Sequence, residues 1–284
     1  MADTDAPAPR TGGSGRCGQN AAVPFRLLQL TDLHLYADPE RRLLGQNTRR
    51  TLESVLSLAQ TRHWPPDAIV LTGDLVHDEQ PAAYRFLRSR FDGLGIPYHC
   101  IPGNHDRLDL LVGHLDRSAA SALRLVPAGA WDLLLLDSTV PAEEGGHLDE
   151  RVLAGLAAHA AADRRRPTLV FLHHHLAPLG SRWIDTMQVD NGPAALAALA
   201  SHPDLSAVIC GHVHQDAEQR QAGLRLLATP STCVQFLPGS RDFALDPLTP
   251  GYRWLELHPD GRLDTGVERT DAYPEPFTPA TEGY

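Results

Sequence analysis

The sequence predicts an α/β fold in which strands and helices alternate along one large domain. Three observations support this: short apolar runs recur along the chain, polar clusters follow them, and helix-like amphipathic stretches lie between them. A chain of 284 residues is long enough to bury one sizeable core. We therefore expect one domain over residues 25–270, with irregular tails at 1–24 and 271–284.

Eight apolar runs have the length of β-strands, and several are too continuously apolar for a sheet with one face in water. The first six are Phe25–Leu30, Ala68–Leu71, Tyr98–Ile101, Leu133–Leu136, Thr168–Leu172 and Ala207–Cys210. They are predicted to be buried central strands. Two later runs, Leu224–Ala228 and Tyr252–Leu257, come without long helices and suggest a second, partly antiparallel sheet.

Three helices are predicted from capping residues that precede amphipathic stretches. Asn47 can cap the first helix, and Asp149 can cap a second that runs to about Asp163. Asn191 together with Pro193 begins a third helix. The side chain of Asn191 either caps this helix or faces a cleft, and the cap is the favoured interpretation.

Composition excludes several classes of partner. The formal net charge is −10, which argues against binding to a nucleic-acid polymer. No apolar run approaches the roughly 20 residues of a membrane span, so we expect no membrane partner. The first 24 residues lack the apolar stretch of a secretory signal, and the four cysteines form no close pair. Reduced thiols in a cytoplasmic protein are the simplest interpretation, although disulfides stay open. The oligomeric state also stays open, with a homodimer among the alternatives.

Polar residues of particular types follow five of the predicted strands. The motifs are Thr31-Asp32-Leu33-His34, Thr72-Gly73-Asp74, Pro102-Gly103-Asn104-His105-Asp106, His173-His174-His175 and Gly211-His212-Val213-His214. Sites in open α/β sheets form at the carboxyl ends of strands, so parallel neighbours would bring these residues into one cleft. Imidazole and carboxylate together suit Mn, Fe or Zn, and one carboxylate can bridge two cations about 3.5–4 Å apart.

Each motif alone has a plainer explanation. An Asp and a His after a strand usually form a turn and a cap, and Gly-Asp is common turn chemistry. The paired histidines of the last motif could lie on the surface, and the triple histidine could be a solvated run. The occurrence of all five motifs in this order, after five strands, favours a metal site over coincidence.

This series of motifs resembles the calcineurin-like metallophosphoesterase superfamily over about residues 25–268. The resemblance implies a four-layer α/β/β/α sandwich of two mixed sheets flanked by helices, with two divalent or trivalent metal ions, Fe and/or Mn. It assigns Asp32, His34 and His214 to the first metal, Asn104, His174 and His212 to the second, and Asp74 to both.

The choice of His174 within the histidine run depends on spacing. The family has a proline soon after this ligand, and Leu176 stands in its place here. Successive residues of an extended segment point in opposite directions, so the side chain of His174 should face away from those of His173 and His175. His77, His99, His147 and His175 are not expected to be ligands.

Further segments resemble one subgroup, the bacterial class III phosphodiesterases that convert 3′,5′-cyclic AMP to 5′-AMP. They are Leu43-Leu44-Gly45, Trp183 with Asp185, Gly211-His212-Val213-His214-Gln215, Leu226–Phe236 and Pro250–Trp254. The resemblance implies attack of a metal-bridging hydroxide on phosphorus, in line with ribose O3′. It makes His105 and Asn104 catalytic, and Asp106 either orients His105 or only serves the turn. The implied substrate contacts come from His34, Asp74, Asn104, His105 and His214.

Two other functions remain open at this point. The same metal residues would serve a broader phosphodiesterase or a nucleotide pyrophosphatase, and a substrate panel separates these from a cyclic AMP enzyme. A scaffold that has lost catalysis would be expected to lack the non-ligand histidine or several ligands. Every expected position is filled here, which disfavours the scaffold.

Overall fold

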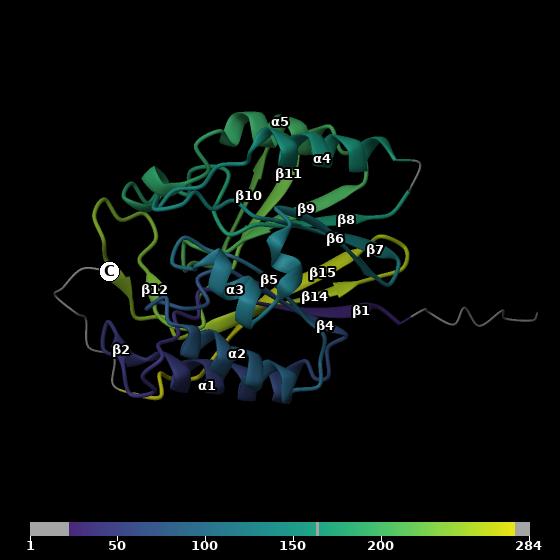
Figure 1. Cartoon of the computed structure of the whole chain (residues 1–284). Coiled ribbons are helices and arrows are strands. Elements are labelled where there is room, and N and C mark those ends of the chain that lie inside the picture. The colour runs from purple at the N-terminus through teal and green to yellow at the C-terminus, as the bar shows by residue number, and fades with distance from the viewer. Residues whose placement is uncertain (1–22, 163–164, 276–284) are drawn as a thin grey trace, which may run out of the picture.

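The computed structural model describes residues 23–162 and 165–275. Two β-sheets lie face to face at its centre, and helices cover the outer face of each (Figure 1). Both sheets mix parallel and antiparallel pairs. The predicted four-layer sandwich is therefore confirmed. Most of the two predicted tails, residues 1–22 and 276–284, lies outside the described residues.

The first sheet contains the three strands that precede the first three motifs. In spatial order its strands are β15 (Leu263–Arg269), β14 (Gly251–Leu257), β1 (Phe25–Leu30), β4 (Ala68–Thr72) and β5 (Tyr98–Ile101). β1, β4 and β5 are parallel, whereas β14 and β15 are antiparallel additions. The carboxyl ends of the three parallel strands consequently meet at one edge.

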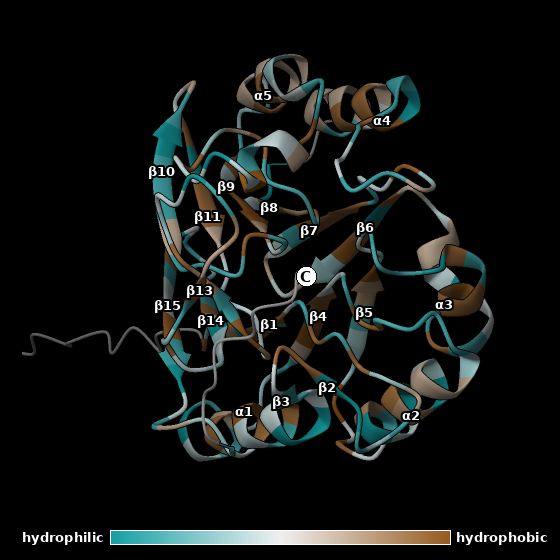
Figure 2. Cartoon of the chain, turned by 90° about the vertical axis from the view of Figure 1, so that its left-hand side faces the viewer, coloured by the Kyte–Doolittle hydropathy of each residue, from teal (hydrophilic) through white to brown (hydrophobic). Residues whose placement is uncertain are grey.

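The second sheet contains the strands that precede the other two motifs. Its order is β10 (Ala217–Gln221), β11 (Leu224–Ala228), β9 (Leu205–Cys210), β8 (Thr168–Phe171), β7 (Trp131–Leu136) and β6 (Leu123–Ala128). The four inner strands are parallel. The edge strand β10 is mostly polar, as Figure 2 shows, which suits an edge that must not pair with another chain.

Five α-helices form the outer layers of the described part. They are α1 (Thr48–Arg62), α2 (Pro81–Asp92) and α3 (Leu108–His114) on the first sheet, and α4 (Glu150–Ala161) and α5 (Gly192–Ala200) on the second (Figure 1). Two short hairpins, β2–β3 (Arg42–Leu43, Gln46–Asn47) and β12–β13 (Gln235–Phe236, Leu245–Asp246), project beyond the sheets.

Apolar side chains fill three separate layers between these elements. Leu28 belongs to the layer under α1–α3, and its neighbour Leu27 belongs to the layer between the two sheets. This alternation follows from the two-residue period of a strand, so β1 is buried on both faces. Val170 lies in the third layer, under α4 and α5. The layers hold the carboxyl ends of β1, β4, β5, β8 and β9 in fixed relative positions.

All eight predicted strands are present, and two of the three predicted caps are confirmed. Asn47 Oδ1 accepts from Arg50 N at 3.1 Å, and Asp149 Oδ1 accepts from Val152 N at 2.8 Å. The third cap is wrong, because the Asn191 amide instead binds the backbone N and O of Leu148, at 3.1 and 2.7 Å. Asn191 Oδ1 accepts one of these bonds and Asn191 Nδ2 donates the other.

The expectation that the two late runs belong to a second, partly antiparallel sheet is confirmed for Leu224–Ala228 (β11) and wrong for Tyr252–Leu257 (β14). β14 and β15 extend the first sheet, whereas β10 and β11 extend a second sheet that β6–β9 already form. The local sequence predicts where a strand lies and how long it is, but it does not predict which other strand it pairs with. The structure also contains α2 and α3, which the sequence analysis did not identify.

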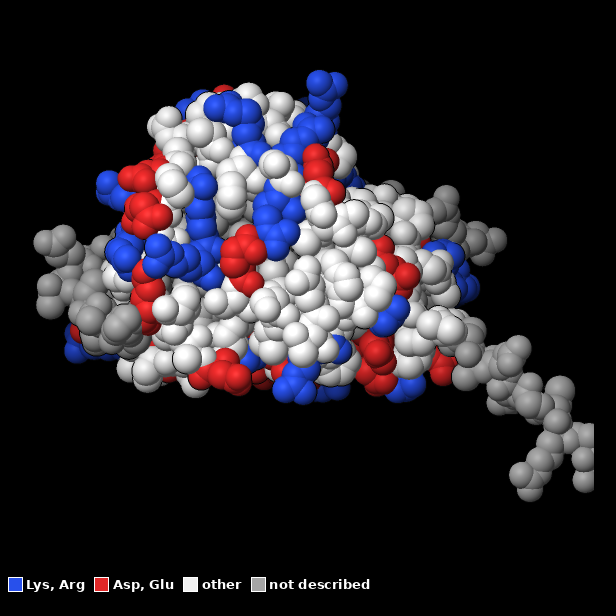
Figure 3. Space-filling view, turned by 90° about the horizontal axis from the view of Figure 1, so that it is seen from below, with Lys and Arg blue, Asp and Glu red and all other residues white. Residues whose placement is uncertain are grey.

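Basic and acidic side chains are interspersed on the face seen in Figure 3. Ion pairs such as Arg90–Glu53, at 2.6 Å, illustrate this mixing. Among the described residues, no helix has both the length and the apolarity to cross a membrane.

Candidate metal centre and active site

The five motifs converge where the carboxyl ends of the two sheets meet. The sequence analysis expected the motifs to follow neighbouring strands of one sheet. Instead, three motifs follow strands of the first sheet and two follow strands of the second. Gln29 joins the sheets beside the site, because its Oε1 accepts from Thr229 Oγ1 at 2.5 Å and its Nε2 donates to Cys210 O at 3.4 Å. The site is therefore an interface between two sheets.

Five of the predicted ligands have left-handed backbone conformations, which are uncommon outside glycine. Their φ values are 54° at Asp32, 46° at His34, 51° at Asp74, 67° at His212 and 49° at His214. Such residues cluster at functional sites, where the surrounding structure supports the strain. Glycine is required beside them: a Cβ on Gly103 would collide with the Asp74 carboxylate, and one on Gly211 would collide with Thr31 Oγ1.

Asp32, His34 and His214 form the first group of ligand atoms. The Nε2 atoms of the two histidines are 3.3 Å apart, and His214 Nε2 is 3.3 Å from Asp32 Oδ1. All three residues are fully buried. The other ring nitrogen of His214 is 2.7 Å from Val234 O, which fixes the ring orientation as a metal ligand requires.

Asp74 lies between the first group and the second. Its Oδ2 is 3.6 Å from His34 Nε2, and its Oδ1 is 3.4 Å from His173 Nε2. Asn104 Oδ1 lies 3.1 Å from the same nitrogen of His173. A carboxylate with one oxygen toward each group has the placement of a bridge between two cations.

Sequence spacing favours His174 for the second group, whereas side-chain partners favour His173. Both histidines lie close to His212, with ligand atoms within 4.8 Å, so proximity does not choose between them. His173 presents Nε2 to Asp74 and Asn104, while its Nδ1 is 2.8 Å from Thr72 O.

His174 is engaged elsewhere through both ring nitrogens. Its Nδ1 is 2.9 Å from Ser138 Oγ, and its Nε2 is 3.2 Å from Glu144 O. The two adjacent rings do take different directions, with an interplanar angle of 86°. The ring of His173 is the one that faces the other expected ligands Asp74 and Asn104.

The donor set fits a pair of metal ions. Within the described residues, His212 Nε2 is buried and has no hydrogen-bond partner, an arrangement that a cation would satisfy. Burial lowers the pKa of His212 well below its ordinary value, with a further contribution from His174. Burial likewise lowers the pKa of His34. Both imidazoles are therefore neutral at pH 7, as ligation requires.

Asp74 and His173 show what charge the centre favours. Burial opposes ionisation of Asp74, but His173 and His105 hold the pKa of Asp74 well below its ordinary value. Burial also opposes a charge on His173, yet the Asp74 carboxylate raises the pKa of His173 to about 9. A positive charge beside Asp74 is therefore stabilised, and a cation would supply it.

His105 lies beside the metal groups and lines the adjacent cavity. Its ring centroid is 5.0 Å from that of His34. Asp106 does not orient it: the Asp106 carboxylate accepts from the backbone N of Leu75, Val76 and Gly103 and from the Tyr84 hydroxyl. Of the two roles considered for Asp106, the structure therefore supports the turn.

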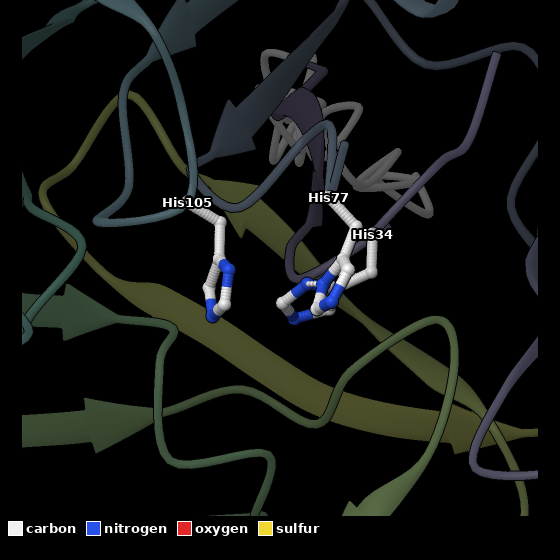
Figure 4. A group of neighbouring side chains, drawn as sticks. All are labelled: His34, His77 and His105. Atoms are coloured by element: carbon white, nitrogen blue, oxygen red, sulfur yellow. Dashed lines mark hydrogen bonds between the residues drawn. The ribbon is translucent and has the colours of Figure 1, made fainter. Parts of the chain in front are cut away.

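His77 is a neighbour that the sequence analysis set aside. Its Nδ1 is 3.1 Å from His34 Nδ1, and its ring stacks on His105 with centroids 4.7 Å apart (Figure 4). If Nε2 of His34 binds a cation, its Nδ1 keeps the proton and donates a hydrogen bond to His77 Nδ1. His77 would then orient a metal ligand, and no sequence motif marks this role.

Replacing His77 with alanine is expected to weaken metal binding at the first site about 10- to 100-fold, because His34 loses the partner of its Nδ1 proton. Calorimetric titration of the metal-free protein with Mn²⁺ would measure this. His99, which is half-buried on β5, provides the matched control in His99→Ala. Unchanged affinity in His77→Ala would contradict the orienting role.

A cavity of about 400 Å³ opens next to these residues. Its lining includes Asp74, Asn104, His105 and His212. The volume lies within the usual range for small-molecule sites, roughly 300–1,000 Å³. A substrate in this cavity would contact both the bridging carboxylate and His105.

Similarity to known proteins agrees with this chemistry. The family model described as calcineurin-like phosphoesterase matches residues 25–216, which is more than half of the chain and includes all five motifs. The chain is a calcineurin-like phosphoesterase. This superfamily uses a dinuclear metal centre, and the two groups around Asp74 are the candidate ligands in this phosphoesterase.

Curated relatives extend the similarity beyond the family match. The 3′,5′-cyclic adenosine monophosphate phosphodiesterase CpdA of Escherichia coli (strain K12) is 41% identical, over 91% of this chain and 94% of that protein. The protein of the same name from Pseudomonas aeruginosa is 40% identical, over 86% of this chain and 90% of that protein. A dimetal phosphatase from Danio rerio shares the fold, with a TM-score of 0.61 and 19% identity, over 88% of this chain and all of that one.

Proposed function

We propose that this phosphoesterase hydrolyses 3′,5′-cyclic AMP to 5′-AMP. The observation that carries the proposal is sequence identity of about 40% to CpdA proteins over most of the chain. The match to the Escherichia coli protein spans 91% of this chain and therefore extends well beyond the metal motifs. The cavity beside Asp74 is large enough for a small nucleotide.

The proposed ligands are those that converge around Asp74, with His173 in place of His174. They are Asp32, His34 and His214 for one cation, Asn104, His173 and His212 for the other, and Asp74 for both. Their imidazole and carboxylate donors suit Fe and Mn, which we propose as the native metals. Bound there, two cations would polarise the phosphate and activate a water molecule.

His105 and Asn104 act on the substrate itself in this proposal. His105 lines the cavity beside the bridging carboxylate and can give a proton to the departing ribose O3′. The amide N–H of Asn104 can donate to a phosphate oxygen while its Oδ1 faces the cation. The backbone N of His105 donates to Asp74 Oδ1 at 3.0 Å, which couples the position of this loop to the bridging carboxylate.

Turnover by the metal-reconstituted protein tests the proposal. Cyclic AMP, other cyclic nucleotides, a nucleotide diphosphate ester and bis-p-nitrophenyl phosphate would be compared at matched concentrations, with products identified chromatographically. We expect 5′-AMP from cyclic AMP with the highest kcat/KM of the panel. Preference for the diphosphate ester would indicate a pyrophosphatase, and no turnover in the fully metallated protein would indicate a scaffold.

Alanine variants of the histidine run test the choice of ligand. We expect His173→Ala to lose the metal of the second site, because its Nε2 faces Asp74 and Asn104. We expect His174→Ala to keep both metals, because its nitrogens contact Ser138 and Glu144 instead. Elemental analysis of the two proteins gives the answer. The reverse pattern would restore the assignment that spacing favours.

The oligomeric state and the cellular location are further predictions, and each needs its own measurement. Analytical ultracentrifugation would test whether the chain is a homodimer. Cell fractionation would test the cytoplasmic location.

A further inference from the structure

The cavity beside the metal centre has two chemically different parts. Its polar part contains Asp74, Asn104, His105 and His212, where a phosphate would lie. The remaining lining is mostly apolar: it contains Ala142, Trp183, Ile184, Met187 and Phe243 together with Glu143 and Glu144. The metal chemistry needs no apolar wall, so this second part calls for its own explanation.

Trp183 is held in one orientation in this wall. Its Nε1 donates to Ser240 Oγ at 3.1 Å. Its ring meets Phe236 and Phe243 edge to face, with centroid distances of 5.0 and 5.2 Å and interplanar angles of 74° and 79°. Phe236 in turn stacks on His214, with centroids 4.0 Å apart. The indole is therefore fixed relative to a proposed metal ligand.

The backbone around Trp183 is also tied down. Arg182 N donates to Ser240 O at 2.9 Å, which joins this segment to the loop between β12 and β13. The Asp185 carboxylate accepts from Leu179 N and Gly180 N, at 2.8 and 2.9 Å. A rigid aromatic wall beside a phosphate site is preorganised, so ligand binding would cost little ordering there.

We propose that the apolar part of the cavity is a nucleobase subsite, in which Trp183 stacks on a flat face of the base and Phe243, whose ring is nearly perpendicular to the indole, contacts the edge of the base. The inference rests on the proposed function, because it places the phosphate over the metal ligands. A base has apolar faces and stacks on aromatic side chains. The subsite therefore supplies affinity for nucleotides over phosphodiesters that lack a base.

Inhibition by two product-like compounds tests the subsite. 5′-AMP carries the base and ribose 5-phosphate lacks it, and both would compete with bis-p-nitrophenyl phosphate in the metal-loaded full chain. We expect 5′-AMP to inhibit more strongly than ribose 5-phosphate in the original protein. In Trp183→Leu, we expect inhibition by 5′-AMP to weaken about 5- to 150-fold, the equivalent of one base–aromatic stack.

Several controls separate stacking from general damage. Inhibition by ribose 5-phosphate and by inorganic phosphate should stay unchanged in Trp183→Leu, and Trp183→Phe should recover most of the 5′-AMP affinity. Trp254→Leu is the matched control. Trp254 lies on β14 of the first sheet and stacks on His63, with ring centroids 5.2 Å apart. If Trp183→Leu does not fold, Phe243→Leu makes the same comparison.

Two outcomes would overturn the subsite. One is equal inhibition by 5′-AMP and ribose 5-phosphate in the original protein. The other is equal weakening of all three inhibitors in the Trp183 and Phe243 variants. Neither readout requires hydrolysis of cyclic AMP. Failure of the proposed function would instead appear as turnover of bis-p-nitrophenyl phosphate without turnover of cyclic AMP.

Discussion

Asp74→Ala is expected to lose metal from both sites and nearly all phosphodiesterase activity. The carboxylate places one oxygen 3.6 Å from His34 Nε2 and the other 3.4 Å from His173 Nε2. Its removal therefore takes a ligand from each proposed site and leaves Asp32 as the only carboxylate among the proposed ligands. By contrast, His34→Ala should mainly empty the first site, because the proposal assigns His34, together with Asp32 and His214, to that site alone.

Elemental analysis and turnover of Asp74→Ala, His34→Ala and Asp109→Ala would check this. Asp109 is an exposed carboxylate that pairs with Arg107, so its variant should match the original protein. Asp74 Oδ1 also accepts from His105 N at 3.0 Å, so the fold of each variant should be verified by circular dichroism. Two full equivalents of metal in a folded Asp74→Ala would refute the bridging role.

His105→Ala is expected to lose activity in proportion to how poor the leaving group is. Ribose O3′ leaves as a basic alkoxide and benefits from a proton donor, whereas a nitrophenolate leaves readily without one. We expect turnover of cyclic AMP to fall about 10²- to 10⁴-fold, the usual contribution of general acid catalysis. The loss on bis-p-nitrophenyl phosphate should be much smaller.

Metal content separates this role of His105 from ligation. It should stay near that of the original protein in His105→Ala, and His114→Ala on α3 is the matched control. Equal losses on the two substrates would show that His105 stabilises charge on the phosphate itself or positions Asn104. Unchanged turnover of cyclic AMP would remove His105 from the mechanism.

Local sequence identified the central strands, three of the five helices of the described part and the candidate metal-site residues. Continuous apolar runs identified the central strands, because a strand buried on both faces has no polar side to alternate with. Asn47 and Asp149 identified helix starts, since their side chains can accept from a free backbone N–H. Asp, His and Asn after five strands indicated a metal site before any geometry was known.

Tertiary structure decided which strands pair and which side chains meet. The strand runs carry no information about sheet membership, so only the fold could place β14 beside β1 and split the motifs between two sheets. Spacing favoured His174 within the histidine run, but spacing does not report the direction of a ring. The ring of His173 is directed by its contacts with Thr72 and Asn104. The ring of His174 is directed by its contacts with Ser138 and Glu144.

The supporting residues were beyond the sequence for the same physical reason. His77 contacts His34 across 43 positions, and Phe236 stacks on His214 from a separate hairpin. Such contacts depend on the angle at which loops leave the two sheets, and left-handed residues such as Asp74 set part of that angle. Residue types thus identified the candidate ligands, and packing between the sheets determined how these side chains are oriented and what surrounds them.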